Sequence, residues 1–175
     1  MQSLHETLGL VIKDYSGKPA DYPIPASSEL MLFYIQRNNT FNSVIFEINL
    51  DQGGIINLHD PMDIFWLYYH ENGVIETLPI NAIQRNLAYG YVFEVIQNDL
   101  IRFHFKVYPD ISFFISKIDG QFKVTTKLKN DRMIVTNLYV HTEDLGIFPQ
   151  VIFVEFFGKN LENNSDQYFK LTIQK

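Results

Sequence analysis

The residues best suited to chemistry or recognition surround Arg85, in the run Gln84-Arg85-Asn86-Leu87-Ala88-Tyr89-Gly90. If this run is helical, Arg85 and Tyr89 are four residues apart and share one face. The guanidinium could then hold a carboxylate through two hydrogen bonds while the phenol orients the same ligand. Alternatively, Arg85 pairs with a carboxylate of the protein itself, such as Glu94 or Glu155, and pins the helix across a sheet.

An aromatic run, Phe65-Trp66-Leu67-Tyr68-Tyr69, contains the only tryptophan of the chain. Successive side chains of a strand point to opposite faces, so Trp66 and Tyr68 share one face of this strand. One face is then core, and the other is an aromatic patch that would line a ligand cavity or meet a protein partner. The simpler alternative assigns the whole run to the core.

The segment His59-Asp60-Pro61-Met62-Asp63 holds one imidazole and two carboxylates, which makes a metal bound through nitrogen and oxygen conceivable. Its spacing matches no familiar metal motif, and an Asp before Pro is common in turns. The chain has no cysteine, which excludes thiolate nucleophiles and cysteine-bound metals. It also lacks the Gly-x-Ser-x-Gly and His-Glu-x-x-His motifs of familiar hydrolases. We therefore expect no catalytic residue, no metal site and no cofactor.

The elements that position these residues are predicted to be mainly strands. Twenty Ile, eleven Val, 15 Phe and 10 Tyr against four Ala favour β-sheet over helix. Alternation is strict in Leu100–Tyr108, where the odd-numbered residues are apolar. Asp119-Gly120 separates the apolar runs Ile111–Ile118 and Gln121–Lys129 and predicts a hairpin with a type I′ turn. The remaining strands are predicted at Leu30–Arg37, Ser43–Leu50, Ile64–Glu71, Val74–Leu78, Tyr91–Ile96, Met133–Thr142, Gln150–Phe157 and Gln167–Ile173.

Strands at such short spacing predict a mainly β fold, an antiparallel meander that forms a barrel or a two-layer sandwich. One or two short helices accompany it. Pro79–Tyr89 has apolar residues at helical spacing and ends before Gly90, and Ser3-Leu4-His5-Glu6 has the spacing of a capping box. We expect a short helix or tail and an extended lead-in over residues 1–28, and a single antiparallel β domain over residues 29–175.

Charge limits the expected partners. The formal net charge is −6 and no run of Lys or Arg is present, so the field of the protein repels a phosphate backbone and nucleic acid is not an expected partner. The longest stretches without a charged residue have ten residues, about half of what a membrane-spanning helix needs. No basic and apolar leader opens the chain. We expect it in the cytoplasm as it stands, and in the periplasm or envelope if a leader has been removed.

Four segments, in this order, resemble a known family: Leu32-Phe33-Tyr34-Ile35-Gln36-Arg37-Asn38, Phe65-Trp66-Leu67-Tyr68-Tyr69, Gln84-Arg85-Asn86-Leu87-Ala88-Tyr89-Gly90 and Val154-Glu155-Phe156-Phe157-Gly158. Over roughly Pro23–Ile173 the chain resembles DUF4833, a family of uncharacterised and mostly bacterial proteins. The Gln-Arg-x-x-Ala-Tyr-Gly stretch is the most specific of the four. The resemblance implies no established activity that could be carried over to particular residues.

Together these patterns predict a protein that acts by binding rather than by catalysis, on a small, partly apolar and anionic molecule. The predicted ligand-binding residues are Trp66, Tyr68, Gln84, Arg85 and Tyr89. The alternative is a protein–protein interaction module or an envelope-associated structural module whose aromatic strand docks a partner. A hydrolase or isomerase that uses Arg85, His104 or the segment His59–Asp63 is a third hypothesis.

Overall fold

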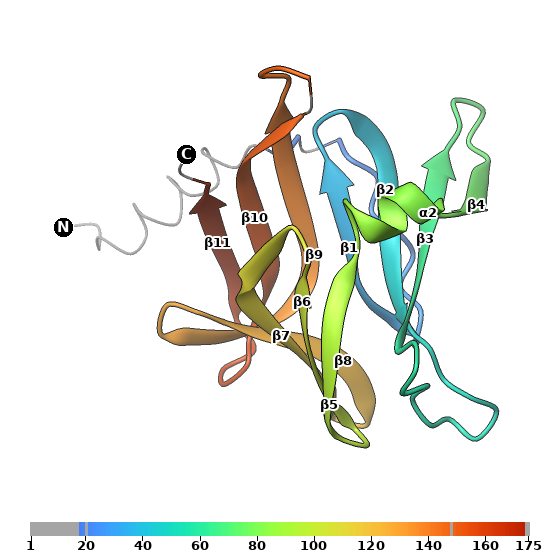
Figure 1. Ribbon diagram of the computed structural model, residues 1–175, viewed down its shortest axis with the longest axis vertical. Coiled ribbons are helices and arrows are strands. Elements are labelled where there is room, and N and C mark those ends of the chain that lie inside the picture. Colours follow the sequence, from blue (N-terminus) through green and yellow to red (C-terminus); the bar gives the residue numbers. More distant parts are fainter. Residues whose placement is uncertain (1–17, 20, 148, 174–175) are drawn as a thin grey trace.

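The computed structural model describes residues 18–19, 21–147 and 149–173 of the chain. Within them the chain forms eleven strands and one short helix (Figure 1). The strands are β1 (Met31–Arg37), β2 (Thr40–Ile48), β3 (Met62–Tyr69), β4 (Ile75–Pro79), β5 (Tyr91–Gln97), β6 (Leu100–Phe105), β7 (Tyr108–Ile118), β8 (Gln121–Leu128), β9 (Asp131–Glu143), β10 (Gln150–Asn160) and β11 (Asp166–Thr172). The helix α2 (Ala82–Asn86) connects β4 to β5. The helix predicted to begin at Ser3 lies outside the described residues.

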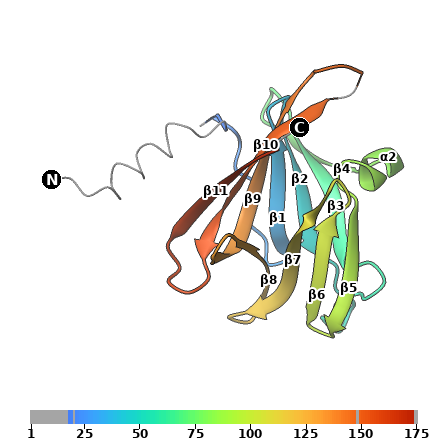
Figure 2. The same cartoon turned by 60° about the vertical axis from the view of Figure 1, so that its left-hand side comes forward.

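Nine strands follow one another in a curled sheet, in the order β4-β3-β2-β1-β9-β8-β7-β6-β5. Two antiparallel meanders build it, β1 to β4 and β5 to β9. The meanders join where β1 and β9 pair in parallel, from Tyr34 with Asn137 to Arg37 with Val140. Figures 1 and 2 show the sheet curving into a half-barrel, with β10 and β11 continuing along one side. The predicted mainly β, barrel-like fold is confirmed. The parallel pairing of β1 with β9 was not predicted, because neighbouring strands of a meander are antiparallel.

The strand β9 is where the sheet divides. Its residues 131–134 pair with β8, its residues 137–140 pair with β1, and β10 runs along its other edge. One long strand therefore pairs with strands of both meanders and joins them into one sheet.

A β-bulge marks the point at which β9 changes partner. The pairing of β10 with β9 skips Thr136, whose hydroxyl donates to the Phe157 carbonyl at 3.0 Å. On the opposite strand, a Cβ added to Gly158 would lie 1.8 Å from the Ile134 carbonyl oxygen, so only glycine fits there. Because a bulge shifts the alternation by one residue, side chains before and after it face the same interior. These interior residues of β9 are Met133, Val135, Leu138 and Val140.

Phenylalanine rings fill the interior between the two meanders. Phe33 stacks on Phe46 with 4.5 Å between ring centroids, and Phe103 stacks on Phe113 with 5.2 Å. Phe105 meets both pairs edge-on, 5.8 Å from Phe46 and 5.5 Å from Phe113. Each such pair contributes about 0.5–1.5 kcal/mol beyond the burial of its area. The Phe105 ring therefore contacts the inner faces of both meanders.

The outer face of β1 and β2 is held by hydrogen bonds to the lead-in. The Gln36 side chain is fully buried and donates from Nε2 to the Pro23 carbonyl at 2.6 Å and to the Ser43 hydroxyl at 2.9 Å. The Tyr22 hydroxyl donates to the Arg37 carbonyl at 2.7 Å. Buried polar groups need such partners, so Tyr22 and Pro23 are part of the fold on this side of the sheet.

Glu155, the acid that interrupts the apolar strand β10, is fully buried on the same outer side. Its carboxylate accepts a hydrogen bond from the Tyr168 hydroxyl at 2.5 Å. Burial and this carboxylate raise the pKa of the Tyr168 phenol well above its usual value. The Lys18 ammonium lies over the rings of Tyr34 and Phe157; burial lowers its pKa, and Glu155 partly offsets that change. This acid therefore belongs to the outer face of the sheet, opposite the phenylalanine rings.

Turn chemistry was predicted more accurately than strand length. Asp119 and Gly120 have φ of 53° and 80°, as a type I′ turn requires, and this hairpin is confirmed. The strand predicted over Leu100–Tyr108 ends at Phe105 instead. A turn follows in which the Lys106 amide bonds to the Gly90 carbonyl at 2.9 Å and Val107 is 60% exposed. In the described part of the chain, no helix is long and apolar enough to cross a membrane.

Candidate ligand-binding site

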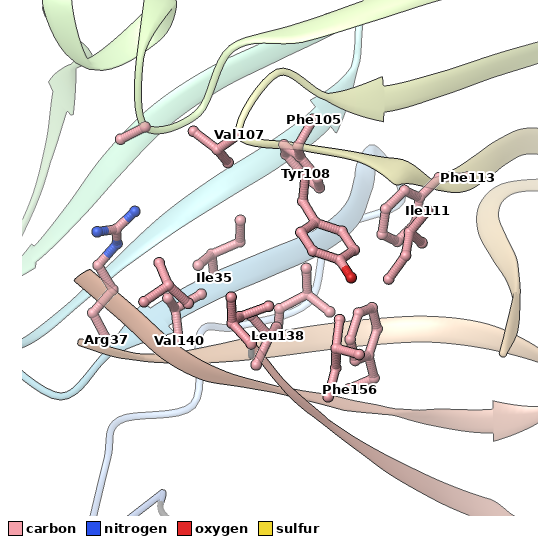
Figure 3. A pocket seen from close by; sticks show the side chains of 15 residues that line it. Ile35, Arg37, Phe105, Val107, Tyr108, Ile111, Phe113, Leu138, Val140 and Phe156 are labelled. Atoms are coloured by element: carbon pink, nitrogen blue, oxygen red, sulfur yellow. The ribbon is translucent and has the colours of Figure 1, made fainter. Parts of the chain in front are cut away.

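A pocket of about 140 Å³ opens between the inner faces of β1, β9, β10 and β11 and the β6–β7 hairpin (Figure 3). Apart from one arginine and one tyrosine, its lining is apolar. The lining residues are Ile35, Arg37, Ala88, Phe105, Val107, Tyr108, Ile111, Phe113, Leu138, Val140, Val151, Val154, Phe156, Leu171 and Ile173. We call this space the Arg37 pocket.

Local sequence features explain why this lining is apolar. The bulge at Thr136 turns Leu138 and Val140 inward, and on β10 the inward residues are Val154 and Phe156. An apolar cavity of about 150 Å³ remains dry and accepts one benzene ring. The Arg37 pocket, at about 140 Å³, is therefore suited to an apolar group of that size.

Arg37 is the one charged residue among the described residues that line the pocket. It ends β1 and lies on the inner face with Phe33 and Ile35, because alternate residues of a strand share a face. Its guanidinium carbon lies 4.9 Å from the centroid of the Tyr89 ring, a cation–π contact. Its Nε is buried and has no hydrogen-bond partner in the described structure. No described carboxylate forms an ion pair with it.

Tyr108 supplies the second polar group of the lining. In Figure 3 its hydroxyl projects into the pocket, toward the side where Leu138 and Phe156 lie. The pocket thus pairs a long apolar wall with a cation at one end and a hydroxyl within it.

Four of the five predicted site residues come together, directly behind Arg37. The Trp66 indole donates from Nε1 to the Gln84 side chain at 3.2 Å. The Trp66 ring meets Tyr68 at 5.7 Å and Tyr89 at 5.8 Å between centroids. Trp66 is 9% and Tyr89 is 3% exposed, and none of the four is among the described residues that line the pocket. Of the four, Tyr89 contacts the Arg37 guanidinium. Burial raises the pKa of the Tyr89 phenol, and the neighbouring Arg37 charge partly offsets this.

The prediction that Arg85 and Tyr89 share a helical face is wrong. The helix α2 is capped at its start by Asn81, and it ends at Asn86 with Leu87 as its C-terminal cap. Beyond that cap the Tyr89 amide bonds to the Gln84 carbonyl at 2.9 Å. The chain therefore leaves the helix before Tyr89, whose ring enters the core.

Arg85 has a carboxylate partner, but it is neither Glu94 nor Glu155. Its guanidinium donates to both oxygens of Asp60, at 2.8 and 3.0 Å, and the two side chains are 45% and 43% exposed. The Tyr91 hydroxyl donates to the same carboxylate at 3.1 Å. Burial, and then Asp60, raise the pKa of the Tyr91 phenol well above its usual value.

This ion pair lies in a second hollow, which we call the Arg85 hollow. It measures about 170 Å³ and is lined by Asp60, Arg85, Asn86, Gly90, Tyr91, Phe93 and Lys106. The structure therefore places Arg85 in a different hollow from the Arg37 pocket.

The groups considered for metal binding or catalysis do not converge. His59 and Asp63 are exposed, and Asp60 is bound to Arg85. His104 alternates with Phe103 and Phe105, whose rings face the interior, so its imidazole points away from the pocket. Over the part of the chain that the structure describes, no group of three or more His, Asp or Glu side chains is placed to hold a metal ion.

Arg37 and Tyr108 were not among the site residues predicted from the sequence. A signal for Arg37 was present, since it continues the inward positions Phe33 and Ile35 of one alternating strand. A charged residue on the apolar face of a strand is a candidate for function, because the burial of an unpaired charge is costly. Tyr108 carried no such signal, because its place in the pocket depends on the turn that ends β6.

The family comparison agrees with the resemblance found in the sequence. A family model described as Domain of unknown function (DUF4833) matches residues 33–169, which is most of the chain. The chain therefore belongs to the DUF4833 family. Neither a curated protein nor a solved structure matches it significantly.

Proposed function

We propose that this member of the DUF4833 family acts by binding a small, partly apolar ligand in the Arg37 pocket. One observation carries the proposal: an apolar pocket of about 140 Å³ opens on the inner face of the sheet, with a single cation among its described lining residues. Sites for small molecules combine such an apolar lining with a few polar groups that orient the ligand.

The lining favours binding over catalysis. Its described residues offer one guanidinium and one phenol, and no carboxylate or imidazole. General acid–base chemistry usually needs one of these latter groups within hydrogen-bond reach of the substrate. The pocket can hold and orient a molecule with the groups that it has.

The size of the pocket sets the expected affinity. A small ligand gains a net binding free energy of about 0.3–1.5 kcal/mol per non-hydrogen atom. At about 0.5–0.85 kcal/mol per atom, a ligand of about eight such atoms should bind with a dissociation constant between about 10 μM and 1 mM.

The proposal is tested with benzyl alcohol, an uncharged probe with one benzene ring, in a ligand-observed NMR titration of the full chain. We expect saturable binding to the wild type. Leu171→Trp fills the pocket from β11 and should weaken binding at least about tenfold, because about 1.4 kcal/mol corresponds to a factor of ten.

Thr172→Trp is the matched control, since Thr172 is exposed and next to Leu171 on the same strand. It should leave binding within about twofold of the wild type, a change of less than about 0.5 kcal/mol. Binding that does not saturate, or that both tryptophans weaken equally, would contradict the proposal. Thermal unfolding of each variant checks that it is folded.

A further inference from the structure

We infer that the ligand of the Arg37 pocket is a monocarboxylate whose apolar part has about the size of a benzene ring, with its carboxylate held by Arg37. This inference rests on the proposed binding function and adds the chemical class of the ligand.

The charge of Arg37 has no carboxylate partner among the described residues. Several exposed cations of this acidic protein have carboxylate partners, as in Arg85 with Asp60, Arg102 with Glu94 and Lys159 with Asp166. Arg37 forms no such pair with any described residue, although its Nε is buried. Tyr89 supplies a cation–π contact worth about 0.5–2 kcal/mol and a neutral hydroxyl beside the guanidinium, but no negative charge. An anionic group on the ligand supplies that charge.

The number of donors favours a carboxylate. A guanidinium has a planar fork of N–H groups that matches the two oxygens of one carboxylate. A phosphate monoester carries nearly two charges and three acceptor oxygens. The described lining provides a single cation for it and one hydroxyl, that of Tyr108. A ligand with one negative charge is therefore the better complement.

The apolar residues of the pocket determine the size and the aromatic character of the uncharged part of the ligand. Phe105, Phe113 and Phe156 contribute rings to the lining, and the volume of about 140 Å³ corresponds to one further ring. Aromatic rings gain from edge-on and offset contacts with one another. An arylacetate places such a ring one carbon away from its carboxylate, which suits a cation at the end of an apolar pocket.

Arg37 is also fixed before a ligand arrives. The Tyr22 hydroxyl holds its backbone carbonyl at 2.7 Å from the outer face, and Tyr89 stacks on its guanidinium from the core. Tyr89 is in turn in edge contact with Trp66. An immobilised side chain loses less entropy on binding, so this support increases the affinity for an anion.

The test compares phenylacetate with phenylacetamide, which have nearly the same size but differ in charge. Isothermal titration of the wild type should show phenylacetate binding at least about tenfold more tightly, since a charge-assisted hydrogen bond contributes about 1.5–3 kcal/mol. Arg37→Gln should remove this preference and leave the binding of phenylacetamide within about twofold. Arg37→Lys keeps the charge without the planar fork and should restore part of the preference.

Arg102→Gln is the control for the loss of a surface cation, because Arg102 lies on β6 and pairs with Glu94; it should leave the preference unchanged. Equal wild-type affinity for the two compounds overturns the carboxylate inference but leaves the binding function intact. Equal weakening of both compounds by Arg37→Gln also overturns it, since Arg37 then has a structural role. A preference that Arg85→Gln removes instead assigns the anion to the Arg85 hollow. If neither compound binds, the proposed function falls as well.

Discussion

Arg37 and Arg85 are both arginines that line a hollow of this protein, but their surroundings differ in polarity and in charge. Arg85 is about half exposed and donates to both oxygens of Asp60, at the rim of a polar hollow. Arg37 ends an inward-facing strand, stacks on a buried tyrosine and borders an apolar pocket. Arg85 therefore has a carboxylate partner, Asp60, whereas Arg37 forms an ion pair with none of the described carboxylates.

The comparison shows how a site for a ligand differs from an ion pair that holds a fold together. In an exposed ion pair the carboxylate already neutralises the arginine, and the pair contributes little to the stability of the fold, about 0–1 kcal/mol. A cation that is held by packing and has no carboxylate partner can still form an ion pair with an anionic ligand. The following predictions test whether the two hollows differ in this way.

The largest expected effect is on stability, at the ring that shapes the Arg37 pocket. Phe105→Ala removes a buried ring that contacts both meanders, and it should lower the free energy of unfolding by about 3–5 kcal/mol. Phe93→Ala is the matched change in the Arg85 hollow, where the ring is only partly buried, and should cost roughly half as much. Urea unfolding of both variants measures the difference. Equal losses of unfolding free energy would show that the ring in the pocket wall contributes no more to stability than the ring in the Arg85 hollow.

The next effect concerns tyrosine ionisation. The folded-state pKa values of Tyr89 and Tyr91 both lie above the usual 10.0, so burial of their neutral phenols stabilises the fold at every pH below 10. That contribution is lost as the pH rises above 10. The neighbouring charge is positive for Tyr89 and negative for Tyr91, so Tyr91 should ionise at the higher pH. Ultraviolet absorbance of tyrosinate, compared between Tyr89→Phe and Tyr91→Phe, measures the order. The reverse order contradicts the assigned charge environments.

The smallest effect is expected at the exposed ion pair. Arg85→Gln should lower the free energy of unfolding by less than about 1 kcal/mol, and added salt should reduce the difference further. Arg37→Gln should lower the free energy of unfolding by about 0.5–2 kcal/mol through the lost cation–π contact with Tyr89, with little dependence on salt, because no described ion pair is broken there. Chemical unfolding at low and high salt measures both. A salt-dependent loss for Arg37→Gln would reveal an ion pair at that residue.

Most of the fold could be predicted from the sequence, because alternation and turn residues are local signals. The hairpin at Asp119-Gly120 and the strand β3 with Trp66 follow from them directly. The parallel pairing of β1 with β9 could not, because it depends on contacts between residues about a hundred positions apart. The bulge at Thr136 carries no composition signal either, and it decides which residues of β9 face the pocket.

The site was predicted in part for the same reason. Trp66, Tyr68, Gln84 and Tyr89 do gather, but Arg85 lies in another hollow because α2 is too short to bring Arg85 and Tyr89 onto one face. Whether any of the five residues binds a ligand stays a prediction. The residue that the structure puts at the pocket is Arg37, the last residue of the strand β1.

The most direct measurement is a crystal structure of the full chain with 4-bromophenylacetate, at a concentration for which binding in solution has been shown. The anomalous signal of the bromine locates the ring independently of the carboxylate. We expect the bromine beside the wall formed by Leu138 and Phe156, and the carboxylate oxygens within hydrogen-bond distance of the Arg37 guanidinium. A carboxylate bound to Arg85 or Lys106, with the apolar pocket empty, would contradict the account.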